Sequence, residues 1–136
     1  MPHAAALALI AAYYAAFNAG DHPAMLALLA DDVRHDINQS PPAHGKPAFA
    51  AFMAEMRRAY DEHLTDITIM ATADGTRAAA EYVVHGAYLA SQPGLPAASG
   101  QRYLLPGGAF FAIANGRITR VTNYYNLEDW LAQVKP

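Results

Sequence analysis

The sequence predicts an α+β domain in which a curved antiparallel sheet wraps around three N-terminal helices. Helix-forming segments come first along the chain, long segments of β character follow, and proline and glycine interrupt the strand expected over residues 102–114. The chain has 136 residues, of which 54% are hydrophobic and only 15% charged, so it can bury one core. With no repeat or linker, a single domain over residues 1–136 is expected.

The first two helices are indicated by composition and by their end signals. Residues 4–18 are rich in Ala and Leu, Gly20 suits the left-handed position that ends a helix, and Asp21 is a good cap for a second helix. The first segment is too short to cross a bilayer, and no Lys or Arg precedes it as in a secretory signal. The chain also has no cysteine. We therefore expect a cytoplasmic protein without a membrane partner.

The remaining elements follow from alternation and turn signals. Asp74-Gly75 and Asn115-Gly116 predict tight turns, and Pro106-Gly107-Gly108 indicates a bulge or bend. The expected elements in order are a strand over 33–38, a loop over 39–45, a helix over 46–60, strands over 64–71, 77–89, 102–114 and 117–125, and a helix over 127–134.

Charge and histidine spacing exclude two kinds of ligand. The net charge is −3 and the nine Lys and Arg are scattered, so we expect no nucleic-acid partner. None of the six histidines forms a His-Glu-x-x-His pattern, and no metal site is predicted. We expect no cofactor.

A curved sheet that wraps around helices leaves a cone-shaped interior, in which we expect a small apolar molecule to bind. Asn123 is an uncharged polar residue on a mostly apolar strand face, and a ligand could satisfy its hydrogen bonds. Glu81 and His85 alternate onto the face opposite Tyr82. The predicted ligand-binding residues are Phe49, Phe52, Tyr82, Asn123 and Tyr125.

Three residues are candidates for acid–base chemistry. His35 and Asp36 are neighbours on a strand, so only one of them can point into the interior. A histidine there could titrate near neutral pH, whereas an aspartate would need burial to raise its pKa. Tyr13 is either a hydrogen-bond donor to a substrate oxygen or a core tyrosine with a bonded hydroxyl.

Several motifs resemble nuclear transport factor 2-like and SnoaL-like domains. They are the run from Tyr13 to Asp21, Leu28-Leu29-Ala30-Asp31-Asp32-Val33, Asn115-Gly116-Arg117-Ile118 and Tyr124-Tyr125-Asn126-Leu127. The segments 77–88 and 100–130 are similar to ketosteroid isomerase-related proteins. The resemblance covers nearly the whole chain and implies the cone-shaped, cystatin-like form of this fold. It also implies a homodimer formed through the outer face of the sheet.

The resemblance implies isomerase-like chemistry with part of the catalytic set missing. In ketosteroid isomerase a carboxylate base works with a tyrosine and a protonated aspartic acid. The tyrosine matches Tyr13, the base matches Ile37 or, with a one-residue shift, Asp36, and the protonated acid falls near Ala109. Ala109 cannot donate a hydrogen bond. We therefore expect a related isomerase, cyclase or hydratase activity on an apolar carbonyl or ring compound, or alternatively a binding module without chemistry.

Overall fold

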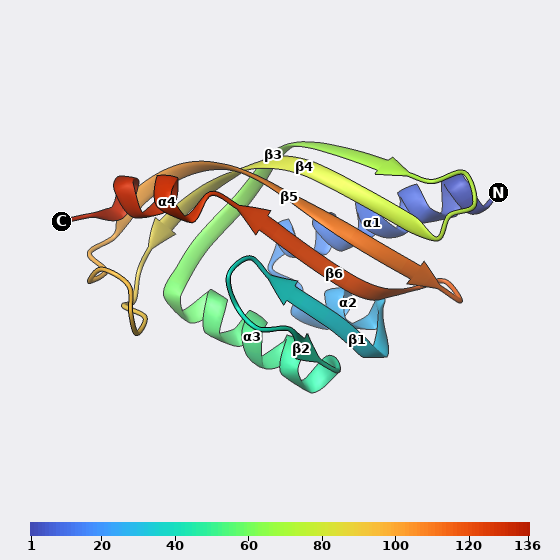
Figure 1. The fold of residues 1–136 in the computed structure, drawn as a ribbon, viewed down its shortest axis with the longest axis horizontal. Helices are drawn as coiled ribbons and strands as arrows, with labels where there is room; N and C mark the ends of the chain where they lie inside the picture. Colours follow the sequence, from blue (N-terminus) through green and yellow to red (C-terminus); the bar gives the residue numbers. More distant parts are fainter.

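The computed structural model describes residues 1–136, and its secondary structure has the order expected of the predicted α+β class (Figure 1). The helices are α1 (Pro2–Ala19), α2 (His22–Ala27), α3 (Lys46–Ala59) and α4 (Leu127–Val134). The strands are β1 (Leu29–Ile37), β2 (Ala43–His44), β3 (Tyr60–Ala71), β4 (Arg77–Tyr88), β5 (Gln101–Ala114) and β6 (Arg117–Tyr125).

The predicted end signals act as expected. Gly20 ends α1 with a left-handed backbone, at a φ of 67°. The side chain of Asp21 accepts a hydrogen bond from the backbone N–H of Ala24 and so caps α2. The side chain of Asn126 caps α4 in the same way through the N–H of Asp129. These short-range bonds fix where the chain turns from one element to the next.

The six strands form one sheet with the order β2-β1-β6-β5-β4-β3. All neighbouring pairs are antiparallel except β1 and β6, which run parallel with His35 opposite Val121 and Ile37 opposite Asn123. The sheet therefore departs from the expected purely antiparallel pattern at this one pair. The parallel pairing brings a strand from the start of the chain beside the last strand.

Three boundaries differ from the expected ones. The chain leaves α2 before Leu29, which is buried and pairs with Ile118 of β6. The short strand β2 lies inside the expected loop over 39–45. Strand β3 begins at Tyr60, directly after α3, rather than at residue 64. At Leu29 and Tyr60 pairing with a strand distant in sequence outweighs the local preference, whereas β2 pairs with the nearby β1.

The bulge expected at Pro106-Gly107-Gly108 is absent, because these residues pair with β4 without interruption. The irregularities lie elsewhere, between Ala112 and Ile113 and between Thr65 and Thr68. Gly107 instead makes room for a ring, since a Cβ built there would lie 2.9 Å from Cε1 of Tyr82. Because Gly107 has no side chain, the ring of Tyr82 can pack closely against its backbone.

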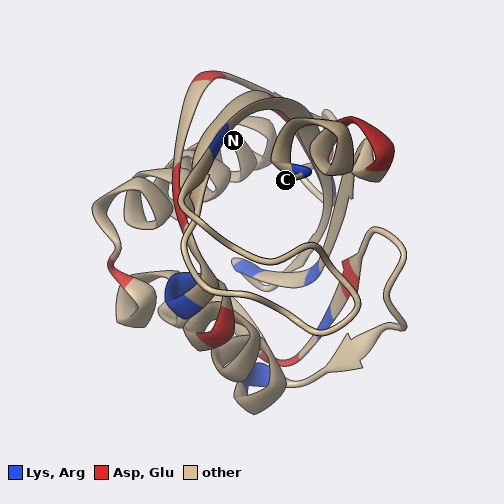
Figure 2. Ribbon diagram, turned by 90° about the vertical axis from the view of Figure 1, so that its left-hand side faces the viewer, with Lys and Arg blue, Asp and Glu red and all other residues tan.

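The sheet curls around the buried faces of α1 and α3, as the end-on view of Figure 2 shows. The core includes Ile10 of α1, Phe49 of α3, Phe111 of β5 and Trp130 of α4. The connection over residues 89–100 crosses the open end of the curled sheet in Figure 2. None of the helices combines the length and the apolar character needed to span a membrane.

Candidate active site

Strand β1 sends His35 and Asp36 to opposite faces of the sheet. His35 points into the interior, where its exposed fraction is 3%. Asp36 lies on the outer face, where it accepts hydrogen bonds from Arg34 Nε at 2.8 Å and from Thr122 Oγ1 at 2.8 Å. Although some burial opposes it, hydrogen bonding to Arg34 and Thr122 keeps the pKa of Asp36 below its usual value. Asp36 is thus held outside the interior, in contrast to the role considered for it from the sequence.

His35 and Asn123 form a polar pair inside the apolar wall. His35 Nε2 lies 2.9 Å from Asn123 Oδ1, and only the N–H of a histidine can donate in this pair. The other ring nitrogen, Nδ1, is buried without any partner. Burial lowers the pKa of His35, so the neutral imidazole is favoured, although the bond to Asn123 opposes this shift. A neutral imidazole that carries its proton on Nε2 can donate this hydrogen bond to Asn123 Oδ1.

Phe49 and Phe52 of α3 enclose this imidazole. The ring of Phe49 stacks on His35 with centroids 4.3 Å apart, and Phe52 meets it edge-on at 4.8 Å. Phe49 is only 2% exposed, so it belongs to the core rather than to a free ligand-binding wall. Phe52 is partly exposed and can still contact a ligand. Phe49 and Phe52 therefore hold the imidazole of His35 in place.

The two tyrosines of α1 take different positions. Tyr13 is buried, with its ring edge-on to Tyr14 at 5.2 Å and to Phe111 at 5.6 Å. Tyr14 also reaches Tyr82, with ring centroids 5.5 Å apart, and its buried hydroxyl has no hydrogen-bond partner. Burial raises the pKa of both phenols, so both stay protonated. The structure thus places the ring of Tyr14 against the predicted ligand-binding residue Tyr82, while the role of Tyr13 stays a prediction.

Glu62 of β3 is a carboxyl group that points inward. Tyr60, Glu62 and Leu64 alternate with the exposed residues Asp61 and His63. The hydroxyl of Tyr103 donates a short hydrogen bond to Glu62 Oε2. The second oxygen, Oε1, accepts no bond within the protein, and it is not among the sealed polar atoms. Burial raises the pKa of Glu62, although the bond from Tyr103 opposes the shift.

Phenols from four strands surround this carboxyl group. Burial raises the pKa of each phenol, and the charge of Glu62 adds to the effect on all of them, namely Tyr60, Tyr82, Tyr103 and Tyr125. Contact with Asn123 opposes the shift for Tyr82. Tyr82 therefore lies close to both the carboxyl of Glu62 and the amide of Asn123.

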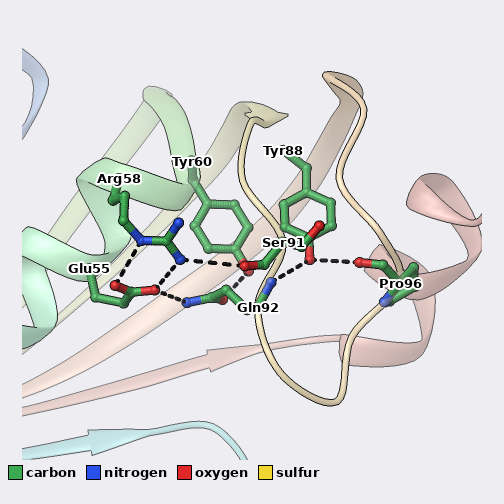
Figure 3. A network of polar contacts seen from close by, with 7 residues as sticks. All are labelled: Glu55, Arg58, Tyr60, Tyr88, Ser91, Gln92 and Pro96. Atoms are coloured by element: carbon green, nitrogen blue, oxygen red, sulfur yellow. Dashed lines mark hydrogen bonds and ion pairs between the residues drawn. The ribbon is translucent and has the colours of Figure 1, made fainter.

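The connection between β4 and β5 is fastened to α3 and to the start of β3 by the network drawn in Figure 3. Tyr60 donates from its hydroxyl to Gln92 Oε1 at 2.5 Å, and Gln92 Nε2 donates to Glu55 at 3.3 Å. The hydroxyl of Tyr88 donates to the carbonyl oxygen of Pro96 at 2.7 Å. The hydroxyl of Tyr60 therefore already donates its hydrogen bond to Gln92. Tyr125 is half-buried and contacts Gln39, and burial raises its pKa, with a further contribution from the charge of Glu62.

No cation lies inside the curled sheet. Seven of the nine Lys and Arg are exposed. The others are Lys46, which pairs with Asp31 at 3.7 Å, and Arg120, which donates to Thr122 on the outer face. No three His, Asp or Glu side chains are grouped so that they could hold a metal ion.

Two hollows lie away from the His35–Asn123 pair, although Tyr103 and Gly86 help to line one of them. One of about 590 Å³ is lined by Asp61, His63, His85, Arg102 and neighbouring residues. The other, of about 510 Å³, lies beside Asp31, Lys46 and Arg117. Neither contains a predicted ligand-binding residue. Aromatic rings pack in and around the core and fill much of the interior of the curled sheet.

Sequence reasoning missed Glu62, Tyr14 and Tyr103. Glu62 was missed because residues 60–63 were assigned to the end of a helix and to a loop. The available signal was the alternation of Tyr60, Glu62 and Leu64, which continues the pattern of the expected strand. A glutamate at an inward position of that pattern gives no hydrophobic signal, so the pattern alone does not reveal its burial.

Comparison with known proteins identifies relatives of this chain. Residues 10–121 match the family described as SnoaL-like domain. A candidate polyketide cyclase from Xanthomonas campestris is 56% identical, with a TM-score of 0.96 over 99% of this chain and 100% of that one. Another from Pseudomonas putida is 64% identical, with a TM-score of 0.94 over 95% and 97%. A Mycobacterium tuberculosis epoxide hydrolase shares the fold at 18% identity, with a TM-score of 0.77 over 97% and 86%. No curated protein matches the chain.

Proposed function

Because the chain belongs to the SnoaL-like domain family, we propose that it is an enzyme for cofactor-free acid–base chemistry on a small uncharged carbonyl or ring compound. The reaction is an isomerisation, cyclisation or hydration in the interior of the curled sheet. The names of the similar proteins, which include candidate polyketide cyclases, support a compound of this class. The absence of a cation from the interior supports an uncharged one, since a buried anion would have no partner there.

The His35–Asn123 pair carries this proposal. His35 occupies the amide oxygen of Asn123, so the NH₂ group is the part left to donate to a substrate oxygen. Asn123 is partly exposed, and its side chain contacts Tyr82, so the amide and the phenol lie side by side. A fixed donor in a poorly hydrated site stabilises the negative charge that develops on a carbonyl oxygen. The hydroxyl of Tyr82 lies near enough to be a second donor.

Removing these donors should reduce turnover. We expect Asn123→Ala to lower kcat by about 100-fold, the effect of losing one donor to a developing oxyanion. We expect Tyr82→Phe to act in the same direction. The measurement is turnover of a panel of cyclic enones, lactones and epoxides. Tyr124→Phe is the matched control, because Tyr124 loses the same hydroxyl on the outer face of the same sheet.

Two outcomes would contradict the proposal. Turnover that is equal in the parent, Asn123→Ala and Tyr82→Phe proteins would show that the donors are misassigned. Saturable binding that raises the Tm of the parent, with no product from any compound, would favour the non-catalytic binding module.

We also propose that the outer face of the sheet forms a homodimer. Large apolar side chains stand exposed there, with Leu104 at 55%, Phe110 at 46% and Tyr124 at 55%. Phe110 and Tyr124 pack edge-on at 5.9 Å and form a continuous apolar surface. Sedimentation at tens-of-micromolar concentration should show a dimer, and Phe110→Glu should give a monomer. A parent protein that sediments as a monomer at that concentration would refute the dimer.

A further inference from the structure

We propose that Glu62 is the catalytic acid and base of this site, and that its free oxygen Oε1 takes a proton from the substrate and returns it. This inference rests on the proposed function, to which it adds the group that moves the proton. It assigns that role to a residue of β3, away from the catalytic residues considered from the sequence.

The position of Glu62 is fixed by its neighbours. Tyr103 is only 5% exposed, and its ring lies directly over Gly86 of β4, where a Cβ would be 2.1 Å from Cζ. The same ring meets Trp130 edge-on at 6.0 Å. Because Tyr103 is held on two sides, its hydroxyl can hold Glu62 Oε2 in one place. The other oxygen, Oε1, is thereby held in position and stays available to a substrate.

Glu62 is also the one inward carboxyl group of the sheet. The other acidic residues of the strands are exposed, apart from Asp36, which is bonded on the outer face. No Lys or Arg lies near enough to pair with Glu62, and the groups that face it are phenols. Burial raises the pKa of Glu62, and the charge of the neighbouring Asp61 adds to this effect. A carboxylate in such surroundings is a stronger base than one in water, because its charged form is poorly solvated.

The alternative base, His35, is less suitable as the structure stands. Its Nε2 is occupied by Asn123, and its Nδ1 is sealed from solvent behind the rings of α3. A substrate could not reach Nδ1 unless those rings moved. His35 therefore acts as a positioning residue, which orients the amide of Asn123.

The proton transfer balances without any other reagent. Glu62 Oε1 forms an O–H bond as the C–H bond next to a substrate carbonyl breaks, and the electron pair moves onto the carbonyl oxygen. Asn123 Nδ2 and the Tyr82 hydroxyl donate hydrogen bonds to this oxyanion. The proton on Oε1 then passes to a carbon atom of the enolate, which restores the carbonyl and the carboxylate. The net reaction is a proton shift within the substrate.

Proton exchange of 2-tetralone in D₂O tests this role without knowledge of the natural substrate. NMR would follow loss of its protons next to the carbonyl, above the buffer rate. The signal is lost because the proton held on Oε1, which is not sealed from solvent, is replaced by deuterium before it returns to carbon. We expect Glu62→Gln to lower the protein-catalysed rate by about 100-fold or more, as for loss of a general base. Glu81→Gln, the same change at an exposed position on the opposite face, should leave the rate unchanged.

The pH profile separates catalysis from a structural role. The rate should fall on the acid side as Glu62 becomes protonated. Because the bond from Tyr103 lowers the pKa of Glu62, Tyr103→Phe should raise that pKa and move the acid limb to higher pH. An acid limb that stays in place in Tyr103→Phe would overturn the assignment of Glu62.

The outcomes distinguish this inference from the proposed function. Full exchange by the Glu62→Gln protein, with slow exchange by Asn123→Ala, would remove Glu62 from the mechanism and leave the proposed function standing. A parent protein that exchanges no protons from 2-tetralone and turns over none of the panel would refute both.

Discussion

Replacing Phe49 with alanine should lower the free energy of unfolding by about 3–5 kcal/mol, the usual cost of truncating a buried phenylalanine. Phe49 is almost fully buried and forms the stacked face of His35. Its loss leaves a cavity and lets water reach the imidazole. Burial lowers the pKa of His35, so hydration should raise that pKa toward its ordinary value.

Urea unfolding measures the stability change, and NMR titration of the histidine ring measures the pKa. Leu89→Ala is the control, because Leu89 is a large apolar residue that is 54% exposed and should contribute within about 0.5 kcal/mol. A loss for Phe49→Ala no larger than that for Leu89→Ala would show that α3 does not pack on His35 as described.

The second large effect is expected at Gly86. A methyl group there would lie 2.1 Å from Cζ of Tyr103, a distance that atoms cannot share. Gly86→Ala should therefore displace the ring and break its bond to Glu62, at a cost of about 1–3 kcal/mol for overpacking. Proton exchange of 2-tetralone should slow as well, because Glu62 loses the group that holds it.

A double-mutant cycle tests whether the clash with Tyr103 is the cause. In a Tyr103→Ala background the ring is gone, and adding Gly86→Ala should cost little. Gly108→Ala in the neighbouring strand is a milder comparison, because the added Cβ would lie 3.2 Å from the carbonyl oxygen of Ala80, which is tight but farther than the 2.1 Å at Gly86. An equal loss for Gly86→Ala with and without Tyr103 would contradict the proposed contact.

Much of the fold could be predicted because its signals are local. The cap at Asp21, the left-handed Gly20 and the hairpin at Asn115-Gly116 depend on residues close in sequence, and all have the expected form. The predicted α+β class with a curved sheet is also confirmed. It could be predicted because the order of helices and strands follows from such local signals. The parallel pairing of β1 with β6 had no such signal, because the two strands are separated by most of the chain.

The candidate site was less predictable because it depends on which face each residue takes. Alternation required that His35 and Asp36 point in opposite directions, but it could not decide which was inside. The pairing with β6 decides it, since Val121 is buried opposite His35 and Asn123 can then reach the imidazole. The inward position of Glu62 depends on where β3 begins. Local sequence preference places the ends of helices and strands poorly.

A crystal structure of the protein soaked with 2-tetralone would test the interior site most directly. The ketone oxygen is expected within hydrogen-bond distance of Asn123 Nδ2, with the adjacent carbon facing Glu62 Oε1. Ketone bound only in the hollow beside His63 and His85, or an interior packed too tightly to admit it, would contradict the account of how this domain works.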